Sequence, residues 1–529
     1  MRVVGSRSGV HSGRLEEYSG GEGASFLPTR PFVPGERVSV HALAGAGAAT
    51  SGVSTTFTVA HQAAVSQVPF PPERGDPREV QHYRSAPAIT PTTVRITHAA
   101  APGTPPGYLF LAPYQAVGSP GPMIVEQSGA LVWFHPLPRG WTATDFQVQQ
   151  YEGRPVLSWW QGRVIRVGFG EGEDVLYDSS YRPIATIRAG NGYRADLHEI
   201  RITPQGTAWI DAFDPIHMSL AGVHGSRAGI LTDSVIQEID IRTGLVMWEW
   251  HALGHIAPRE SLNPVPRGSY PWDYVHVNSI DPGPSGDVLL SARNTWTLYD
   301  VSIHTGAFRW RLGSVRSSFH LARGVRFHWQ HDAEWQPGGL ISVFDNGAIP
   351  AEERQTRGLL IRPDYRRHEA TLVGAFVHPG ARLLAGAQGN VFNVAGGRAW
   401  LLGYGELPNF TMYNPSGHVL LDGTLGRNVQ DFRTYFAPWS GRPQTPPAVA
   451  AQAHGGGIAV QASWNGATEV ASWQVLAGPS PGALAPVLTV RKHGFETSIQ
   501  MSAAGPYVAV TALDASGKAL GTSAPVRAP

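Results

Sequence analysis

One hairpin unit, repeated with a histidine in the same place, constrains the fold more than any other feature of the sequence. In GVRFHWQHDAEWQPGGLISVFDN, Gly324 to Asn346, a strand rich in aromatics runs into a Gly/Pro turn and returns as a second strand. Leu197 to Phe213 and Val275 to Thr295 have the same layout. Each first strand carries a histidine near its start: His331, His198 and His276. The repetition predicts that one β-unit is used several times.

The size and composition of the chain fit a repeated β-unit. The chain has 529 residues, too many for one core, and its 62 glycines and 43 prolines are typical of an all-β protein with many turns. From about Ser85 to Pro438 we count six units, which predicts a six-bladed β-propeller, because a propeller blade has four strands. A pair of β-sandwiches is the alternative. The expected innermost strands are Tyr108 to Leu111, Asp145 to Gln149, His198 to Ile202, His276 to Asp281, His331 to Trp335 and Gln388 to Val394.

A smaller β-unit is expected on each side of the propeller. Residues 1–65 alternate as short strands around turns, which predicts an immunoglobulin-like β-sandwich, similar to modules that precede enzymes in secreted bacterial proteins. Residues 66–84 are rich in Pro and charge and are expected to form a linker. The propeller is expected over 85–440, and 446–529 resembles a fibronectin type III or immunoglobulin-like sandwich. The predicted fold class is all-β.

Charge and composition narrow the range of partners. The net charge is +1 with 15% charged residues and no basic run, so no nucleic-acid partner is expected. No apolar stretch approaches the ~20 residues that a membrane helix needs. The absence of cysteine rules out disulfides and thiolate metal sites. The N-terminus lacks the apolar core of a signal peptide. We expect a secreted or cell-surface protein, with the cytoplasm as the alternative.

The three histidines are expected to meet at one end of a central channel. In a propeller, the first strand of every blade lines the channel and all first strands run the same way, so their starts form a ring. We expect the hairpins to pair Asp281 with Val288, Ile202 with Thr207 and Trp335 with Leu340. These registers then predict the neighbours of each histidine. We expect the following pairs: His276 opposite Arg293, His198 opposite Asp211, and His331 opposite Phe344 and beside Asp345. The prediction is a cluster of imidazoles and one guanidinium, with Asp211 and Asp345 behind it.

Such a cluster suits a tetrahedral oxyanion such as sulfate. The guanidinium of Arg293 can donate hydrogen bonds to two oxygens of an oxyanion at once. An imidazole can act as a nucleophile, a general base or a hydrogen-bond donor. Zinc is the other chemical interpretation of three histidines. The adjacent arginine opposes it, because a fixed cation repels a dication. We therefore predict no metal and no cofactor.

The motifs along the propeller region resemble the arylsulfate sulfotransferase family, in particular its actinobacterial and fungal branch. The matching segments are PGYLFLAP (Pro106 to Pro113), LHEI (Leu197 to Ile200), DYVHVNSI (Asp273 to Ile280), SARNT (Ser291 to Thr295), WRLG (Trp310 to Gly313), FHWQHDAEW (Phe327 to Trp335) and FDNG (Phe344 to Gly347). The resemblance does not cover the flanking sandwiches. It implies a six-bladed propeller that moves a sulfuryl group from an aryl sulfate to a phenol through a sulfated histidine, without a nucleotide donor.

The resemblance also implies roles for individual residues. His331 would be the nucleophile, His276 and Arg293 would match the sulfate-binding pair of the family, and His198 would match its further channel histidine. The alternative for His198 is a core histidine bonded to Asp211. Four aromatic residues are candidates for stacking on the aryl rings, with packing in the blades as the alternative: Trp329, Trp335, Trp272 and Tyr193. The expected partners are small aromatic sulfates and phenols.

Two other functions fit the same residues. A polysaccharide lyase could use a His/Arg cluster to neutralise a uronate carboxylate while another histidine removes the C5 proton. A non-catalytic extracellular protein could bind its ligand through the propeller and adhere through the sandwich domains.

Overall fold

The chain is all-β. The computed structural model describes residues 1–44, 51–70, 75–165, 168–283, 285–314, 316–502 and 504–528. Within these ranges the helical segments are single 3-10 turns: η1 (Pro77–Glu79), η2 (Ala221–Val223), η3 (Pro258–Glu260) and η4 (Arg293–Thr295). A search of the described residues found no helix with the length and apolar character needed to cross a membrane.

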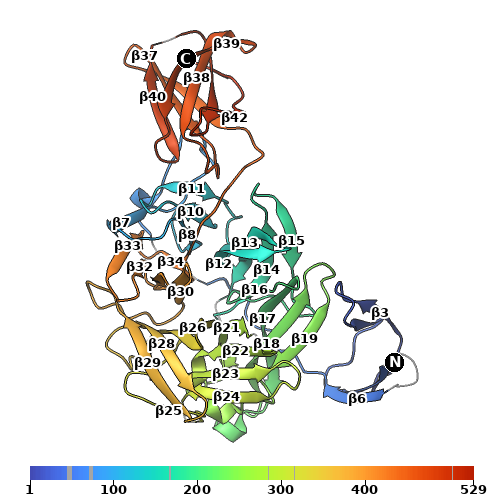
Figure 1. The fold of residues 1–529 in the computed structure, drawn as a ribbon. Coiled ribbons are helices and arrows are strands. Elements are labelled where there is room, and N and C mark those ends of the chain that lie inside the picture. Colours follow the sequence, from blue (N-terminus) through green and yellow to red (C-terminus); the bar gives the residue numbers. More distant parts are fainter. Residues whose placement is uncertain are drawn as a thin grey trace.

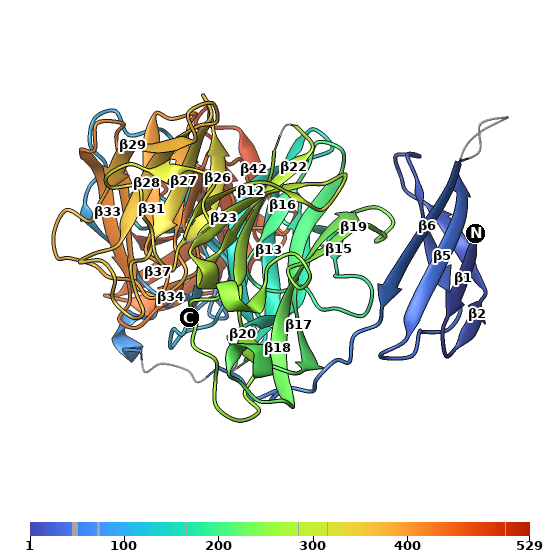
Figure 2. The ribbon, with the colours of Figure 1, turned by 90° about the horizontal axis from the view of Figure 1, so that it is seen from below.

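The N-terminal strands form their own antiparallel sheets beside the main body (Figure 2). One has the order β2-β1-β5-β6, and β3 pairs with β4. The bounds are β1 (Arg2–Gly5), β2 (Gly9–His11), β3 (Gly13–Glu17), β4 (Ala24–Pro28), β5 (Arg37–Ala44) and β6 (Ser51–Thr58). Hydrogen bonds tie the turn between β3 and β4 to the main body, where Ser19 N donates to Asp240 Oδ2 over 2.6 Å.

Six sheets of four or five strands make up the described part of the main body (Figure 1). From the inside outward, the strands of the first sheet are β35 (Tyr435–Ala437), β8 (Tyr108–Leu111), β10 (Met123–Val125) and β11 (Leu131–Phe134). Those of the second are β12 (Thr142–Tyr151), β13 (Arg154–Val164), β14 (Gly170–Tyr177) and β15 (Pro183–Ile187). Those of the third are β16 (Ile200–Ile202), β17 (Thr207–Met218), β18 (Gly229–Asp240) and β19 (Val246–His251), with β20 (Trp272–Asp273) beside β18.

The other three sheets continue the series. From the inside outward, the strands of the fourth sheet are β21 (Val277–Pro282), β22 (Asp287–Ala292), β23 (Thr297–Ser302) and β24 (Phe308–Gly313). Those of the fifth are β26 (His331–Gln336), β27 (Leu340–Asp345), β28 (Arg357–Asp364), β29 (Glu369–Phe376) and β25 (His320–Leu321). Those of the sixth are β30 (Asn390–Val394), β31 (Ala399–Gly403), β32 (Asn409–Tyr413), β33 (Val419–Leu425) and β7 (Val94–His98). A small pair joins β9 (Pro113–Tyr114) to β34 (Gln430–Asp431).

The inner strands form a ring. Each of β12, β16, β21, β26, β30 and β35 contacts the inner strands of the two neighbouring sheets, and β35 returns to β12. The two ends of this region close the ring, because β7 pairs with β33 and β35 pairs with β8. The prediction that Tyr108–Leu111 is an innermost strand is therefore wrong: β8 is second, and the three-residue strand β35 lies inside it. The other expected inner strands overlap inner strands of the ring.

Bulges correct the predicted registers near the histidines. Asp281 pairs with Leu289 and Trp335 with Ile341, each one residue from the expected partner. A bulge after His331 still brings this residue opposite Phe344. A bulge after Val277 likewise lets Arg293 N donate to the carbonyl of His276 over 2.9 Å.

The predicted register of the first histidine strand is wrong by one residue. Ile202 pairs with Ala208 rather than Thr207, and no bulge interrupts the described pairing of β16 with β17. Asp211 consequently receives a hydrogen bond from the backbone N–H of Glu199, 3.2 Å away, instead of standing opposite His198.

The C-terminal strands form two sheets around one core, at the top of Figure 1. Their orders are β36-β37-β40 and β39-β38-β41-β42, with β43 beside β41. Val460, Trp473 and Val510 pack between the sheets. The bounds are β36 (Ala448–His454), β37 (Gly457–Ser463), β38 (Ser472–Ser480), β39 (Ala483–Arg491), β40 (Glu496–Met501), β41 (Tyr507–Leu513), β42 (Ala519–Thr522) and β43 (Val526–Arg527).

Candidate active site on the floor of the central cavity

The histidines and the arginine singled out in the sequence lie together at one cavity. This cavity has a volume of about 1300 Å³, and its lining includes His198, His276, Arg293 and His331. The ring centroids of His198 and His276 are 4.8 Å apart, and those of His276 and His331 are 6.2 Å apart. The starts of three consecutive inner strands therefore bring three imidazoles to one end of the ring.

Two of the imidazoles are backed by carboxylates. His198 Nδ1 bonds to Asp196 Oδ2, and His276 Nδ1 bonds to Asp273 Oδ2 over 2.5 Å. An imidazole that donates its Nδ1 proton to a carboxylate is fixed in orientation, and the carboxylate offsets positive charge on the ring. The two carboxylates therefore fix the orientation of both rings at the cavity, while burial holds the pKa of His198 well below its ordinary value.

His331 has a neutral partner instead. Its Nδ1 lies 2.8 Å from Asn346 Oδ1 and 3.2 Å from the carbonyl of Trp329, while Nε2 accepts a hydrogen bond from Gln388 N over 3.1 Å. Only 1% of the residue is exposed. Burial, followed by the positive charge of Arg293, holds the pKa of His331 well below its ordinary value. The ring is therefore neutral, with the proton on Nδ1 and a lone pair on Nε2.

Arg293 supplies the fixed positive charge. Its side chain donates to Asn294 Oδ1 and to the carbonyl of Gly386, each over 2.9 Å, and its guanidinium lies 4.8 Å above the ring of Trp329. Its Nε has no hydrogen-bond partner among the described residues. Burial lowers its pKa to about 10, so the group remains cationic at neutral pH. This geometry can hold a tetrahedral oxyanion beside the lone pair of His331.

The two carboxylates predicted behind the cluster lie in different relations to it. Asp211 Oδ2 is 3.8 Å from His198 Nδ1, too far for a hydrogen bond. Asp345 binds Arg357 Nε over 2.9 Å and accepts from His328 N, so its carboxylate is turned to those groups rather than to His331.

Sequence reasoning missed the oxygens that bond the three imidazoles. They belong to Asp196, Asp273 and Asn346. The first two stand two or three residues before their histidines, a local spacing that could have identified them. Asn346 directly follows Asp345, and neighbouring residues of an extended chain point to opposite sides. Only the register of the strands therefore decides which of the two side chains faces His331.

Of the four predicted stacking residues, Trp272 lines the cavity. Trp329 packs beneath Arg293, Trp335 packs on Trp310 at 5.7 Å, and Tyr193 lies 6.1 Å from His251. The other aromatic residues of the lining come from the segment before the main body, from β9 and from loops: Phe70, Tyr114, Trp141, Tyr270 and Phe432.

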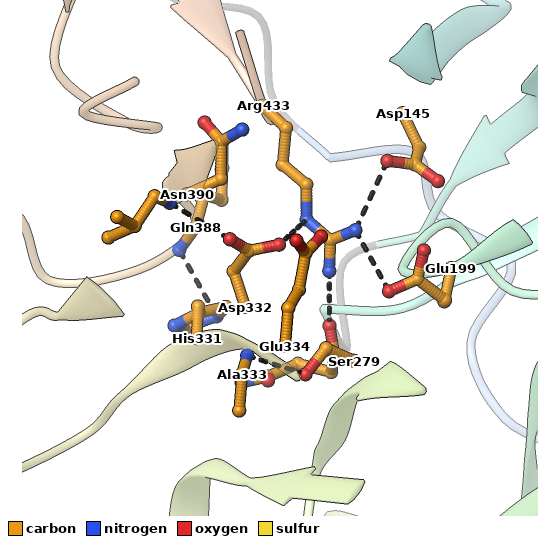
Figure 3. A network of polar contacts seen from close by, with 12 residues as sticks. Asp145, Glu199, Ser279, His331, Asp332, Ala333, Glu334, Gln388, Asn390 and Arg433 are labelled. Atoms are coloured by element: carbon orange, nitrogen blue, oxygen red, sulfur yellow. Dashed lines mark hydrogen bonds and ion pairs between the residues drawn. The ribbon is translucent and has the colours of Figure 1, made fainter. Parts of the chain in front are cut away.

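A buried arginine lies beneath the floor. Arg433 stands two residues before β35, and its side chain is 0% exposed. Figure 3 shows its guanidinium among carboxylates: Nη1 lies 3.1 Å from Asp145 Oδ1 and 2.9 Å from Glu199 Oε2, and Nε lies 3.4 Å from Asp332 Oδ1. Nη2 donates to the carbonyl of Asn278 over 2.8 Å. One cation therefore ties together segments from four sheets directly below the histidines.

Backbone strain aims two of these carboxylates at the arginine. Asp145 and Asp332 have φ values of 54° and 52°, in the left-handed region, and both stand at bulges of their strands. A non-glycine residue adopts this conformation where the surroundings stabilise it. Because Asp332 directly follows His331, the contact with Arg433 also fixes the backbone that carries the histidine.

The comparison with protein families identifies the group to which the chain belongs. An all-β chain whose buried imidazoles and arginine meet at a cavity has a site able to hold and react with an anion. Residues 147–426, more than half of the chain, match the family model of the arylsulfotransferases (ASST). The chain belongs to this family, and in that broad sense it is a sulfotransferase of aryl substrates.

Solved structures resemble the chain only distantly. A Bacteroides caccae protein of unknown function is 14% identical, covers 63% of this chain and 99% of its own, and has a TM-score of 0.37. The periplasmic gluconolactonase PpgL of Pseudomonas aeruginosa is 12% identical over 80% of this chain and 96% of its own, with a TM-score of 0.33. At these TM-scores the likeness bears on neither the fold nor the function. No curated protein matches the chain.

Proposed function

We propose that this protein transfers a sulfuryl group from an aryl sulfate to a phenol by a ping-pong mechanism, without a nucleotide sulfate donor. His331 is the nucleophile and becomes a sulfohistidine. The observation that carries this proposal is the difference between the Nδ1 partners. An amide oxygen of Asn346 stands behind His331, whereas carboxylates stand behind His198 and His276. The amide oxygen keeps the proton of the neutral His331 ring on Nδ1 and leaves Nε2 as the attacking atom, whereas the two carboxylates orient His198 and His276 toward the anion.

In the first half-reaction, the hydrogen bond from Gln388 N to Nε2 of His331 breaks, the freed lone pair attacks sulfur, and the sulfur–oxygen bond to the aryl group breaks. The phenolate leaves with the electron pair of that bond. Arg293, His276 and His198 hold the remaining sulfuryl oxygens, whose negative charge they offset. In the second half-reaction, a phenol that has lost its proton attacks the same sulfur, and the bond to Nε2 breaks to restore the neutral imidazole.

We further propose that the ring of six sheets is a six-bladed β-propeller over residues 85–440. Its support is the cyclic contact of the inner strands and the closure of the ring by β7 and β35. Residues 1–65 and 446–529 would be immunoglobulin-like or fibronectin type III-like sandwiches, with 66–84 as the linker between the first sandwich and the propeller. In such a propeller, the cavity lies at one mouth of the channel.

Turnover with 4-nitrophenyl sulfate and a phenol tests the proposed function. The expected result is release of 4-nitrophenol that depends on the phenol, together with a new aryl sulfate. A lyase would release no nitrophenol and would instead generate ultraviolet-absorbing unsaturated uronates from a uronate polymer. A binding protein would retain the ligand without turnover. Either of these outcomes would contradict the proposal.

The Asn346→Asp variant tests the role of the neutral partner. A carboxylate 2.8 Å from His331 Nδ1 would raise the pKa of the ring, because its negative charge stabilises the protonated imidazole. In the native protein, His331 sulfation should stay constant from pH 8 to below pH 6.5, because the folded pKa of the ring is depressed. In Asn346→Asp, the loss of rate should begin at a higher pH.

Stopped-flow release of nitrophenol across this pH range is the measurement. Asn346→Ala is the matched control, because it removes the hydrogen bond without adding charge. Asn346→Ala should lower the rate of His331 sulfation without shifting the loss of rate at acidic pH to a higher pH. Identical pH profiles for the native protein and Asn346→Asp would show that Asn346 does not tune His331.

The walls of the cavity indicate where the aryl groups bind. The cavity, at about 1300 Å³, exceeds the roughly 300–1000 Å³ of a pocket for a drug-sized ligand. Trp141 lies on its lining, far along the chain from the histidines. Loss of one stacking ring typically costs about 3- to 10-fold in affinity. We therefore expect Trp141→Ala to raise KM for extended phenolic acceptors by about this factor.

His331 sulfation by the small donor 4-nitrophenyl sulfate should be unchanged in Trp141→Ala. Steady-state kinetics with acceptors of increasing size measures the effect. Tyr365→Ala is the control, because Tyr365 is 48% exposed and lies outside the lining. An equal change in KM for the smallest and the largest acceptor would place the acceptor elsewhere.

A further inference from the structure

A second group of chemically active side chains lies behind His198. Asp196, His198 and Asp211 each offer one ligand atom, and these three atoms lie within 4.8 Å of one another. All three residues are buried. Asp196 and His198 come from the segment before β16, and Asp211 comes from β17. The ligand atom of His198 is Nδ1, which points away from the cavity lined by the same ring.

One oxygen of this group lacks a partner. Asp211 Oδ1 accepts from Glu199 N, but Asp211 Oδ2 has no hydrogen bond among the described residues, although the side chain is 0% exposed. A buried carboxylate oxygen without a donor is costly, because it has lost its hydration and received nothing in exchange. Oδ2 is the atom that faces His198 Nδ1, at 3.8 Å.

The negative charge around this oxygen is also uncompensated. Neither oxygen of the buried Asp174 has a hydrogen bond within the described ranges, although the residue is 0% exposed. The two nearby arginines are engaged with other groups. Arg433 binds Asp145, Glu199 and Asp332, and Arg201 binds Glu199 and Glu334. Within the part of the chain that is described, neither Asp174 nor Asp211 is paired with an arginine or a lysine, and the nearest ring nitrogen to Asp211 Oδ2 is His198 Nδ1 at 3.8 Å.

We propose that Asp196, His198 and Asp211 bind a divalent transition-metal ion. One imidazole nitrogen and two carboxylates form a donor set that suits Zn²⁺ or Mn²⁺. The ion would replace the proton that His198 Nδ1 shares with Asp196, which is released to solvent, and would bind Nδ1, Asp196 and the orphaned Asp211 Oδ2. The sequence argued against a metal because Arg293 is near the histidines. In the structure, that guanidinium contacts Asn294, Gly386 and Trp329, and none of the three ligands.

A cation in this position would act on the cavity through the imidazole. An ion on Nδ1 draws electron density from the ring, which makes a proton on Nε2 a stronger donor to an anion on the floor. The role would be to position and polarise His198, with sulfuryl transfer itself remaining at His331. The binding of the ion does not depend on the proposed reaction and can be measured without it.

Metal content of the untagged full-length protein tests the inference. The protein is incubated with Zn²⁺ or Mn²⁺, separated from free ions by gel filtration, and analysed by inductively coupled plasma mass spectrometry. We expect about one ion per chain, as a three-ligand site holds, and an unfolding temperature that falls on treatment with EDTA. Asp211→Asn should reduce the bound metal at least about tenfold, since it replaces a charged ligand.

Asp300→Asn is the matched control. Asp300 lies on β23, is 2% exposed, and has an oxygen without a hydrogen bond, but it belongs to a different sheet and not to this group. It should retain the full metal content. Less than about 0.1 ion per native chain after both incubations would overturn the inference and leave a proton as the compensating charge. Equal metal content in the native protein and Asp211→Asn would overturn it as well, because Asp211 would not be a ligand.

Discussion

The His331→Ala variant should lose sulfuryl transfer. Nε2 of His331 is the atom that forms the bond to sulfur. Among the three described histidines of the cluster, His331 is the one whose Nδ1 has a neutral side-chain partner. Removal of a covalent nucleophile typically costs on the order of 10⁴-fold or more in kcat. We expect at least this loss in kcat with 4-nitrophenyl sulfate and a phenol, with the unfolding temperature close to that of the native protein.

His328→Ala is the matched control for this variant. His328 stands three residues earlier, its Nδ1 lies 3.3 Å from Glu353 Oε1, and it does not line the cavity. Its replacement should change kcat only a few-fold, about the size of a packing effect. Free imidazole added to His331→Ala should restore part of the turnover, because it can occupy the vacated space and accept the sulfuryl group. Native-like kcat in His331→Ala would contradict the proposed nucleophile.

The Arg433→Met variant should lose much of its stability. This change keeps a long side chain but leaves Asp145, Glu199 and Asp332 without their shared cation in the centre of the ring. Breaking a buried ion pair by removing one partner costs about 3–5 kcal/mol, mainly because an uncompensated charge stays buried. Thermal and urea unfolding should both detect the loss.

The control for Arg433 is an exposed ion pair. Arg442 lies 2.6 Å from Glu469, with 72% and 37% of the two side chains exposed. Arg442→Met should change the free energy of unfolding far less than Arg433→Met, because water already solvates both partners. Equal losses in the two variants would mean that the buried network does not stabilise the ring. Because Asp332 is next to His331, we also expect slower turnover in Arg433→Met below its unfolding temperature.

The sequence was sufficient to predict that the three histidines and Arg293 lie together, because the same β-unit repeats and equivalent positions in successive units become neighbours. The predicted registers were one residue out, but bulges in β21 and β26 absorbed the error for His276 and His331. Each bulge contains a residue that contacts Arg433 across the ring: Asn278 through its carbonyl and Asp332 through its carboxylate. Contacts between distant segments leave no local pattern in a sequence.

The structural features that sequence reasoning missed also depend on contacts between distant segments. Strand β35 has three residues, too few for a periodic signal, and Arg433 gains its role only through the placement of that strand. The cavity walls at Phe70, Trp141 and Tyr270 come from connecting segments, whose paths follow from the packing of the whole chain. Trp329 and Trp335 looked equally suitable as binders, but packing buries them within and beneath the sheets.

Mass spectrometry of the protein after a brief incubation with an aryl sulfate, and without any phenol, tests the proposed function most directly. Digestion at neutral or alkaline pH preserves a sulfated imidazole. The account predicts one sulfuryl group on the peptide that contains His331, its disappearance when a phenol is added, and its absence in His331→Ala. A native protein that transfers the group to phenols without any adduct at His331, or with the adduct on another residue, would contradict it.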